Sequence, residues 1–266
     1  MSSLGWLDVT DINFNALLLL EPIHGEGLAS GYYKPSAQMG TALKAHPSVE
    51  WYLRQIHPPV GDYLDQCLAL ANPNPTPEER RQAEIDVMNM IQDWLVYVLD
   101  PAKYDELEFL NWDDDSLLSM TDFKDKVVID IGSGTGRLAF TVAPLADVVY
   151  AVEPVANLRR YIREKSVQLG MDNIYPIDGT ITQIPLPDDF ADIVMLGHVF
   201  GDFPKEECDE MTRVVRSGGM ILLHPGTNTN PKSKPAEYLV QQGFEFDIFE
   251  EPTVGKFRKY WKTIEK

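Results

Sequence analysis

One short segment constrains the fold of this chain more than any other part of its sequence. Residues 127–138 read Val-Val-Ile-Asp-Ile-Gly-Ser-Gly-Thr-Gly-Arg-Leu. The β-branched run at its start predicts a buried strand, and the alternating glycines that follow predict a tight turn with positive φ values. We expect a helix from about Gly136, whose N–H groups and positive dipole end would face an anionic part of a ligand. In an open α/β sheet such a turn lies at the carboxyl ends of the strands, where ligands bind.

Downstream of this segment, short β-branched runs alternate with helical stretches, a pattern typical of a parallel sheet with crossover helices. The expected strands cover residues 127–131, 148–152, 174–177, 191–196 and 220–223. The expected helices cover residues 155–169, 205–215 and 234–242. Two final strands, 244–249 and 257–263, are joined by a short turn that contains Pro and Gly, so we expect them to be antiparallel.

The chain changes character partway along. Residues 1–122 are rich in aromatic side chains and predict a mainly helical N-terminal extension that caps the crevice. Residues 123–266 predict the cofactor-binding domain. The clearest helix of the extension is expected over about 77–99, because Thr76 and Glu79 can form a capping box and helically spaced apolar residues follow them.

The charge of the chain bears on its partners. It has 41 acidic and 23 basic side chains, a net charge of −18, and most of the excess lies in residues 1–122. Such a chain repels a phosphate backbone, which argues against a nucleic-acid partner. The acidic extension is compatible with a cationic or amine substrate, but a solvated acidic surface is the simpler interpretation. The run Asp113 to Asp115 is interpreted as the solvated entry to a short helix, because adjacent carboxylates do not converge on one metal ion.

The sequence indicates no disulfide framework, membrane span or metal site. Cys67 and Cys208 are far apart, which fits a reducing cytoplasm. The longest apolar run, residues 16–20, is far too short to cross a bilayer, and no basic residue precedes it. We therefore expect neither a membrane anchor nor a signal peptide. The histidines are scattered without an i, i+4 pair, so we expect no bound metal.

A carboxylate after the second expected strand strengthens the interpretation of the glycine-rich turn. Glu153 follows residues 148–152, where it can accept hydrogen bonds from both ribose hydroxyls of a nucleoside; the alternative is a solvated strand end. Together with residues 130–136, Asp178-Gly179 and the strand 191–196, Glu153 resembles the motif set of the class I S-adenosylmethionine-dependent methyltransferases.

The resemblance extends over roughly residues 105–266 and implies an α/β fold with S-adenosylmethionine as the cofactor. The implied architecture is a Rossmann-like, seven-stranded sheet in the order 3-2-1-4-5-7-6, with strand 7 antiparallel, preceded by the mainly helical extension. Asp130 would organise the turn near the methionine part, Glu153 would bind the ribose, and Asp178 would lie near the adenine amino group. The other residues that the resemblance assigns to the cofactor site are Gly132, Ser133, Gly134, Gly136, Pro154, Gly179, Thr180, Leu196 and Gly197.

The segment after the fourth strand bears on the methyl acceptor. Residues 197–202 read Gly-His-Val-Phe-Gly-Asp, where some subfamilies have an Asn-Pro-Pro-Tyr motif for methylating amide or exocyclic amino nitrogens. This departure argues against methylation of DNA adenine or of glutamine. We expect in-line methyl transfer to a small molecule, with a protein side chain as the second substrate class. A non-catalytic S-adenosylmethionine-binding module and an NAD-dependent oxidoreductase are the alternatives, and the latter is disfavoured because Arg137 stands where a dinucleotide fold has its third glycine.

A few residues are candidates for catalysis and for substrate contact. His198 follows the fourth strand and is the leading candidate for a general base, or else it shapes the cofactor pocket. Asp202 is the second candidate, with a helix N-cap as the alternative role. His224 follows the fifth strand and could face the substrate or serve the structure. Tyr32 and Tyr33 lie in a glycine-bounded loop that either closes over the cofactor or substrate or packs locally. The sequence does not predict the oligomeric state.

Overall fold

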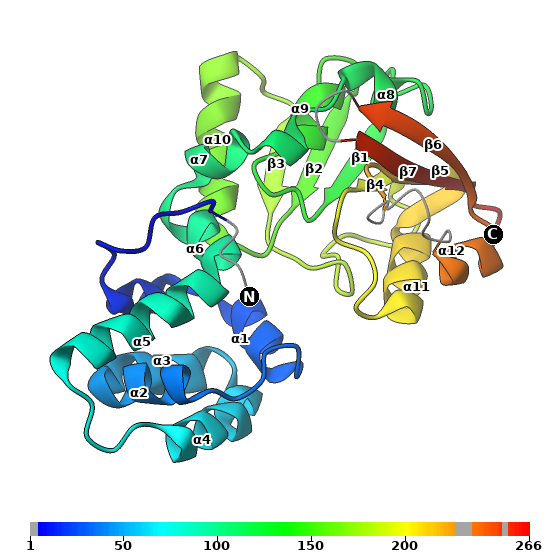
Figure 1. Ribbon diagram of the computed structural model, residues 1–266. Helices are drawn as coiled ribbons and strands as arrows, with labels where there is room; N and C mark the ends of the chain where they lie inside the picture. Colours follow the sequence, from blue (N-terminus) through cyan, green and yellow to red (C-terminus); the bar gives the residue numbers. More distant parts are fainter. Residues whose placement is uncertain (1–4, 227–235, 252–254) are drawn as a thin grey trace. The chain divides into compact units, whose positions relative to one another are not determined.

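The chain folds into two compact units, Met1–Tyr104 and Asp105–Lys266. The structure is a computed structural model that describes residues 5–226, 236–251 and 255–266 (Figure 1). The division between the units comes earlier in the chain than the change of character seen in the sequence. Residues 105–122 belong to the second unit, while the functional domains 1–122 and 123–266 remain predictions.

The first unit is built from helices, as the sequence predicts. Its α-helices are α1 (Pro22–Ala29), α2 (Ala37–Ala45), α3 (Pro47–Ile56), α4 (Gly61–Leu70), α5 (Pro77–Met90) and α6 (Gln92–Leu99), and α7 (Pro101–Asp105) ends at the boundary. Short 3-10 helices cover Phe14–Leu19 and Pro58–Val60. The core consists of fully buried apolar side chains, among them Phe14, Leu17, Leu43, Leu53 and Leu64.

The helix expected over residues 77–99 is in fact two helices. Its start is as predicted, because the Thr76 hydroxyl accepts from the Glu79 N–H (3.2 Å) while the Glu79 carboxylate accepts from the Thr76 N–H (2.9 Å). The regular geometry stops at Ile91, whose φ of −116° and ψ of 25° are not helical. α6 then continues with its own buried residues, so the apolar periodicity persists across a break that no Gly or Pro marks.

Helices α2 and α4 pack so closely that a glycine is needed between them. A Cβ atom on Gly40 would lie 1.9 Å from the carbonyl oxygen of Cys67 and 3.1 Å from the Cβ of Ala71. Cys67 and Ala71 lie at the C-terminal end of α4, so the helix backbone has to move to admit a side chain at position 40.

Gly40→Ala is expected to lower the free energy of unfolding by about 1–3 kcal/mol, the usual cost of overpacking a tight interface. Urea denaturation measures this. Gly61→Ala is the matched control, since a Cβ there meets only the flexible end of Arg54 at 3.3 Å. Equal stability of the two variants would show that α2 and α4 are not in this close contact.

The second unit contains a seven-stranded sheet in the order β3-β2-β1-β4-β5-β7-β6, as the resemblance implied. The strands are β1 (Val127–Ile131), β2 (Val148–Val152), β3 (Ile174–Ile177), β4 (Ala191–Leu196), β5 (Val215–Leu223), β6 (Glu245–Glu251) and β7 (Gly255–Thr263). The first five strands are parallel, and β7 runs antiparallel to both β5 and β6. The predicted topology is therefore confirmed.

Helices cover both faces of this sheet. They are α8 (Asp114–Leu118), α9 (Arg137–Val142), α10 (Ala156–Leu169), α11 (Pro204–Val214) and α12 (Glu237–Gln241). The alternation of side chains along β1 divides the core, since Ile129 and Ile131 pack with α11 and α12 while Val128 packs with α8, α9 and α10. Consecutive parallel strands thus end at one edge of a sheet that is buried on both faces, where the site residues collect.

Other expectations concern bound metals, thiols and membranes. Asp113 caps α8 through its side chain, which accepts from the N–H of Asp115. The described residues contain no group of three or more His, Cys, Asp or Glu side chains that could hold a metal ion. Cys67 and Cys208 are buried and unpaired. None of the helices within the described ranges combines the length and apolar character needed to cross a membrane.

Candidate functional site

The turn between β1 and α9 has the left-handed geometry that its glycines predict. The φ values of Gly132, Gly134 and Gly136 are 62°, 57° and 88°. Residues with a Cβ atom rarely adopt such values, so the turn depends on glycine. Ser133 stabilises it from inside, because its hydroxyl donates to the carbonyl of Asp130 (2.8 Å) and its own carbonyl accepts from the N–H of Gly136 (2.7 Å). We call residues 130–136 the glycine loop.

Glu153, at the end of β2, reaches into the glycine loop. One carboxylate oxygen accepts from the N–H of Gly134 and the other from the N–H of Val155, both at 2.9 Å. The residue is only 4% exposed. It is therefore not the solvated strand end of the alternative interpretation. An ionised carboxylate offers about four acceptor positions, so a group of this kind can bind hydroxyl groups as well as backbone N–H groups.

Arg159 joins the two acids that the resemblance assigns to the nucleoside. Its guanidinium donates to the backbone carbonyl of Glu153 (2.6 Å) and to the carboxylate of Asp178 (3.0 Å), which is exposed at the end of β3. Sequence reasoning missed Arg159, because one arginine among several on α10 carries no distinguishing local signal.

The neighbours of these acids shape the same edge of the sheet. A Cβ on Gly179 would lie 2.7 Å from Pro185 and 2.9 Å from Val152, so a side chain is excluded there. Thr180 forms an isolated bridge with Gln183. Pro154 is half-buried between Glu153 and the start of α10. The structure thus brings the predicted nucleoside residues together, and their contact with a cofactor remains a prediction.

Asp130 is a buried acid that ties β1 to α9. One carboxylate oxygen accepts from the N–H of Ala139 (3.1 Å), and the other has no partner among the described residues. Burial raises the pKa of this carboxyl to about 8, and the nearby charge of Glu153 adds to the effect. The hydroxyl of Thr135 is likewise buried and unpartnered in the described chain. Two such polar atoms in one loop favour a bound polar ligand or ordered water, since leaving them unpaired costs about 1–3 kcal/mol each.

The segment after β4 covers the glycine loop. Gly197 has no room for a side chain, because its Cβ would lie 2.8 Å from the carbonyl oxygen of His224. A methyl group of Val199 would come within 2.3 Å of a Cβ on Gly132. The residues after β4 therefore lie directly against the glycine loop.

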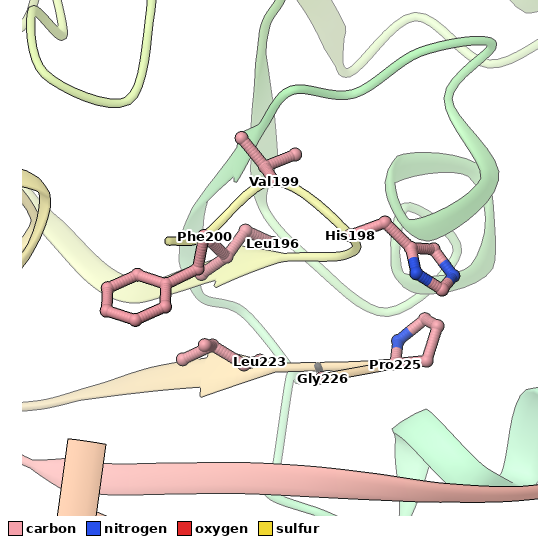
Figure 2. A pocket seen from close by; sticks show the side chains of 7 residues that line it. All are labelled: Leu196, His198, Val199, Phe200, Leu223, Pro225 and Gly226. Carbon is pink, nitrogen blue, oxygen red and sulfur yellow. The ribbon is translucent and has the colours of Figure 1, made fainter. Parts of the chain in front are cut away.

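A cavity of about 220 Å³ lies at the ends of β4 and β5. Its described lining residues are Leu196, His198, Val199, Phe200, Leu223, Pro225 and Gly226 (Figure 2). Figure 2 shows the imidazole of His198 beside Pro225 at one end and the ring of Phe200 at the other. Most of this lining is apolar, and His198 is its one titratable side chain among the described residues.

His198 is held between aromatic rings. Its φ of 61° is left-handed, and its ring centroid lies 5.5 Å from Phe109 and 6.3 Å from Phe257, both in edge-on contacts. Although part of the residue is exposed, the loss of solvent around the imidazole lowers its pKa. The ring is therefore neutral at pH 7 and can accept a proton.

Asp202 is exposed and does not cap the following helix. The alternative prediction, that Asp202 is the N-cap of this helix, is therefore wrong. α11 starts after Phe203, and the buried carboxylate of Glu207 accepts from the N–H groups of Gly201 and Phe203, both at 2.8 Å. A carboxylate one turn inside the helix can reach back in this way, and the sequence did not distinguish it from Glu206.

His224 is completely buried. Its Nε2 lies 2.9 Å from the hydroxyl of Ser116, and its ring lies 4.7 Å from the rings of Trp112 and Phe249. Burial lowers its pKa to about 3, with the nearby charge of Lys259 as a smaller cause. These contacts support the structural role, and contact with a substrate remains a prediction.

Tyr32 and Tyr33 belong to the first unit and differ in exposure. Tyr33 is 6% exposed and packs edge-on against Trp94 (5.2 Å), while Tyr32 is 72% exposed and rests on Tyr33 (5.0 Å). Burial raises the pKa of the Tyr33 phenol above its usual range. Closure of this loop over a substrate remains a prediction.

Known proteins share the part of the chain that forms this site. Residues 129–223 match the family model described as a methyltransferase domain. An uncharacterized methyltransferase of Geobacillus thermodenitrificans is 31% identical over 111 residues, which cover 40% of this chain and 50% of that protein. A demethylmenaquinone methyltransferase of Geobacillus kaustophilus is 31% identical over 119 residues, which cover 42% of this chain and 50% of that protein.

Solved structures also resemble part of the chain. A crystal structure of a SAM-dependent methyltransferase from Aquifex aeolicus covers 61% of this chain and 97% of its own, with a TM-score of 0.47 and 21% sequence identity. The chain spans about half the length of the curated relatives that it matches. Residues 129–223 of the second unit thus match a methyltransferase domain, and the unit has the strand order that the resemblance to the class I S-adenosylmethionine-dependent methyltransferases implied.

Asp130→Asn is expected to change how stability depends on pH. The folded state keeps a proton on Asp130 up to about pH 8, whereas the unfolded carboxyl loses it near its ordinary pKa of 3.8. The wild-type folded state therefore loses stability as the pH rises from about 4 to 8, and the amide of the variant removes this loss. Urea unfolding at several pH values should show the variant gaining relative to wild type across that range. Parallel curves would contradict a buried, protonated Asp130.

Proposed function

We propose that this chain transfers the methyl group of S-adenosylmethionine to a small molecule. The observation that carries the proposal is the geometry around Glu153. Its carboxylate lies on the N–H of Gly134 in the glycine loop, and its backbone is linked through Arg159 to Asp178. A nucleoside bound at this edge of the sheet would meet an acceptor for its ribose hydroxyls and a second acid for its base.

The residues of the site fit such a cofactor. The glycine loop leaves a buried oxygen of Asp130 and the hydroxyl of Thr135 without partners in the described chain, and both can bind polar groups. When bound, S-adenosylmethionine supplies a methyl group already activated by its positive sulfur. The chain's own contribution is then orientation, which is worth about 7–11 kcal/mol in favourable intramolecular models. His198 accepts the proton of an acceptor that has to lose one.

The cavity at the ends of β4 and β5 supports a small acceptor. Its volume of about 220 Å³ exceeds the roughly 150 Å³ that holds benzene in an engineered protein cavity and is below that of most drug-sized sites. The described lining contains no carboxylate, so a cationic acceptor would gain no ion pair there. The demethylmenaquinone methyltransferases among the relatives carry small-molecule names and are consistent with this class.

Other functions have less support. A protein side chain is the second substrate class, and a cavity that widens in complex with a peptide would favour it. A non-catalytic cofactor-binding module would bind S-adenosylmethionine and transfer no methyl group. An NAD-dependent oxidoreductase finds little support in α10, where Tyr161 and Lys165 have Tyr-x-x-x-Lys spacing but both bind the carboxylate of Asp105. The buried free thiols fit the cytoplasm as the location.

Calorimetry with S-adenosylmethionine, S-adenosylhomocysteine and NAD tests the cofactor. We expect the first two to bind and NAD to give no heat of binding, because the site has one nucleoside position and Arg137 where a dinucleotide fold has its third glycine. Binding of NAD alone would overturn the proposal.

Glu153→Gln is expected to weaken S-adenosylhomocysteine binding by about 1–3 kcal/mol, since the amide cannot accept at both of its polar atoms. The dissociation constant from calorimetry measures the loss. Glu164→Gln is the matched control, because that carboxylate is exposed on α10 and lies 3.8 Å from the guanidinium of Arg160. Equal affinities for the two variants would remove Glu153 from the cofactor site.

A further inference from the structure

The segment Asp105–Leu118, which we call the strap, precedes the first strand of the methyltransferase domain and is fixed to it at two places. The first attachment lies at its start. The carboxylate of Asp105 accepts from the ammonium of Lys165 (2.6 Å) and from the hydroxyl of Tyr161 (3.0 Å), both on α10. Lys165 is one-quarter exposed, so this ion pair is partly shielded from water.

The second attachment is Arg137, the first residue of α9 and the neighbour of Gly136 in the chain. Its guanidinium donates to the backbone carbonyls of Leu110 (2.9 Å) and Trp112 (2.6 Å) and pairs with the carboxylate of Asp114 (2.7 Å). The group also lies 3.8 Å from the centre of the Trp112 ring. Only a planar fork of several donors can make these contacts together, so lysine is not an equivalent residue here.

Between the two attachments, the strap contacts the histidine that lines the cavity. Phe109 lies in the short 3-10 helix Glu108–Leu110, and its ring meets the His198 ring edge-on with 5.5 Å between centroids. The strap also contacts His224, which follows β5. The Ser116 hydroxyl lies within hydrogen-bond distance of this imidazole, and the Trp112 ring lies edge-on to it. The strap therefore contacts both histidines at the strand ends beside the cavity, His198 after β4 and His224 after β5.

We propose that the strap is a wall of the methyl-transfer site, and that Arg137 is the positioning residue that holds Phe109 against His198. The proposal rests on the proposed function and extends it to residues that no motif assigns. His198 sits on a left-handed backbone in a loop, so its imidazole needs an outside contact to keep one orientation. Because Arg137 directly follows the glycine loop, a ligand that orders this loop also orders the strap.

The histidine signals of isotope-labelled protein test the contact by NMR without any cofactor. The aromatic ring of Phe109 displaces the resonances of the His198 imidazole, and His198→Asn identifies them among the signals of the five histidines. In Arg137→Met we expect the His198 signals to shift towards the positions of a free histidine. Phe109→Leu removes the ring while keeping an apolar side chain, and it should give the same shift even where Arg137→Met fails to fold.

Two controls separate positioning from a general loss of structure. Arg160→Met removes an exposed arginine of α10 and should leave the His198 signals in place. The signals of His24, which packs against Trp94 in the first unit, should remain unchanged in every variant. Unshifted His198 signals in a folded Arg137→Met variant, or in Phe109→Leu, would overturn the proposal.

Hydrogen exchange tests the link to the glycine loop. With S-adenosylhomocysteine as the ligand, we expect the amides of residues 108–118 to exchange about tenfold more slowly in wild type and to lose this protection in Arg137→Met. Binding without slower exchange in wild type would overturn the link. An absence of binding would contradict the proposed function instead, and the NMR result would still decide whether Arg137 positions Phe109.

Discussion

The hydrogen bond from the N–H of Gly134 to the carboxylate of Glu153 is the interaction on which the site depends. It exists only because the chain turns sharply after β1, with glycines at φ values that other residues avoid. The turn leads into α9 and holds the N–H of Gly134 within hydrogen-bond distance of Glu153 at the end of β2. Parallel pairing of β1 with β2 then fixes the distance between the loop and Glu153.

Much of this arrangement could be predicted from the sequence, because its determinants are local. The β-branched runs, the alternating glycines and the acids at strand ends each lie within a few residues of the structure that they specify. The same locality explains the error over residues 77–99. Apolar periodicity continues through Ile91, and nothing in the neighbouring residues marks the change in its backbone angles.

What the sequence could not predict are contacts between residues far apart in the chain. In the sequence, Arg137 stands out only as the residue at the place of a dinucleotide fold's third glycine, yet its guanidinium reaches the carbonyls of Leu110 and Trp112. The capping of α11 by Glu207 was likewise hidden, because Asp202 precedes the helix and is the usual residue type for a cap. In both cases the residue type was compatible with several roles, and only the packing selects one.

The two histidines that follow β4 and β5 differ in how far packing removes them from solvent, and this decides which of them could exchange a proton. Both lie after neighbouring parallel strands, so the sequence gives them equivalent positions. His224 is sealed between Trp112 and Phe249, where a charge could not be solvated, and its pKa of about 3 keeps it neutral. His198 keeps part of its surface open beside a cavity, so a proton taken up by its imidazole could pass on to water. Since a base has to release the proton after each turnover, the partial exposure of His198 suits it to this role better than burial would.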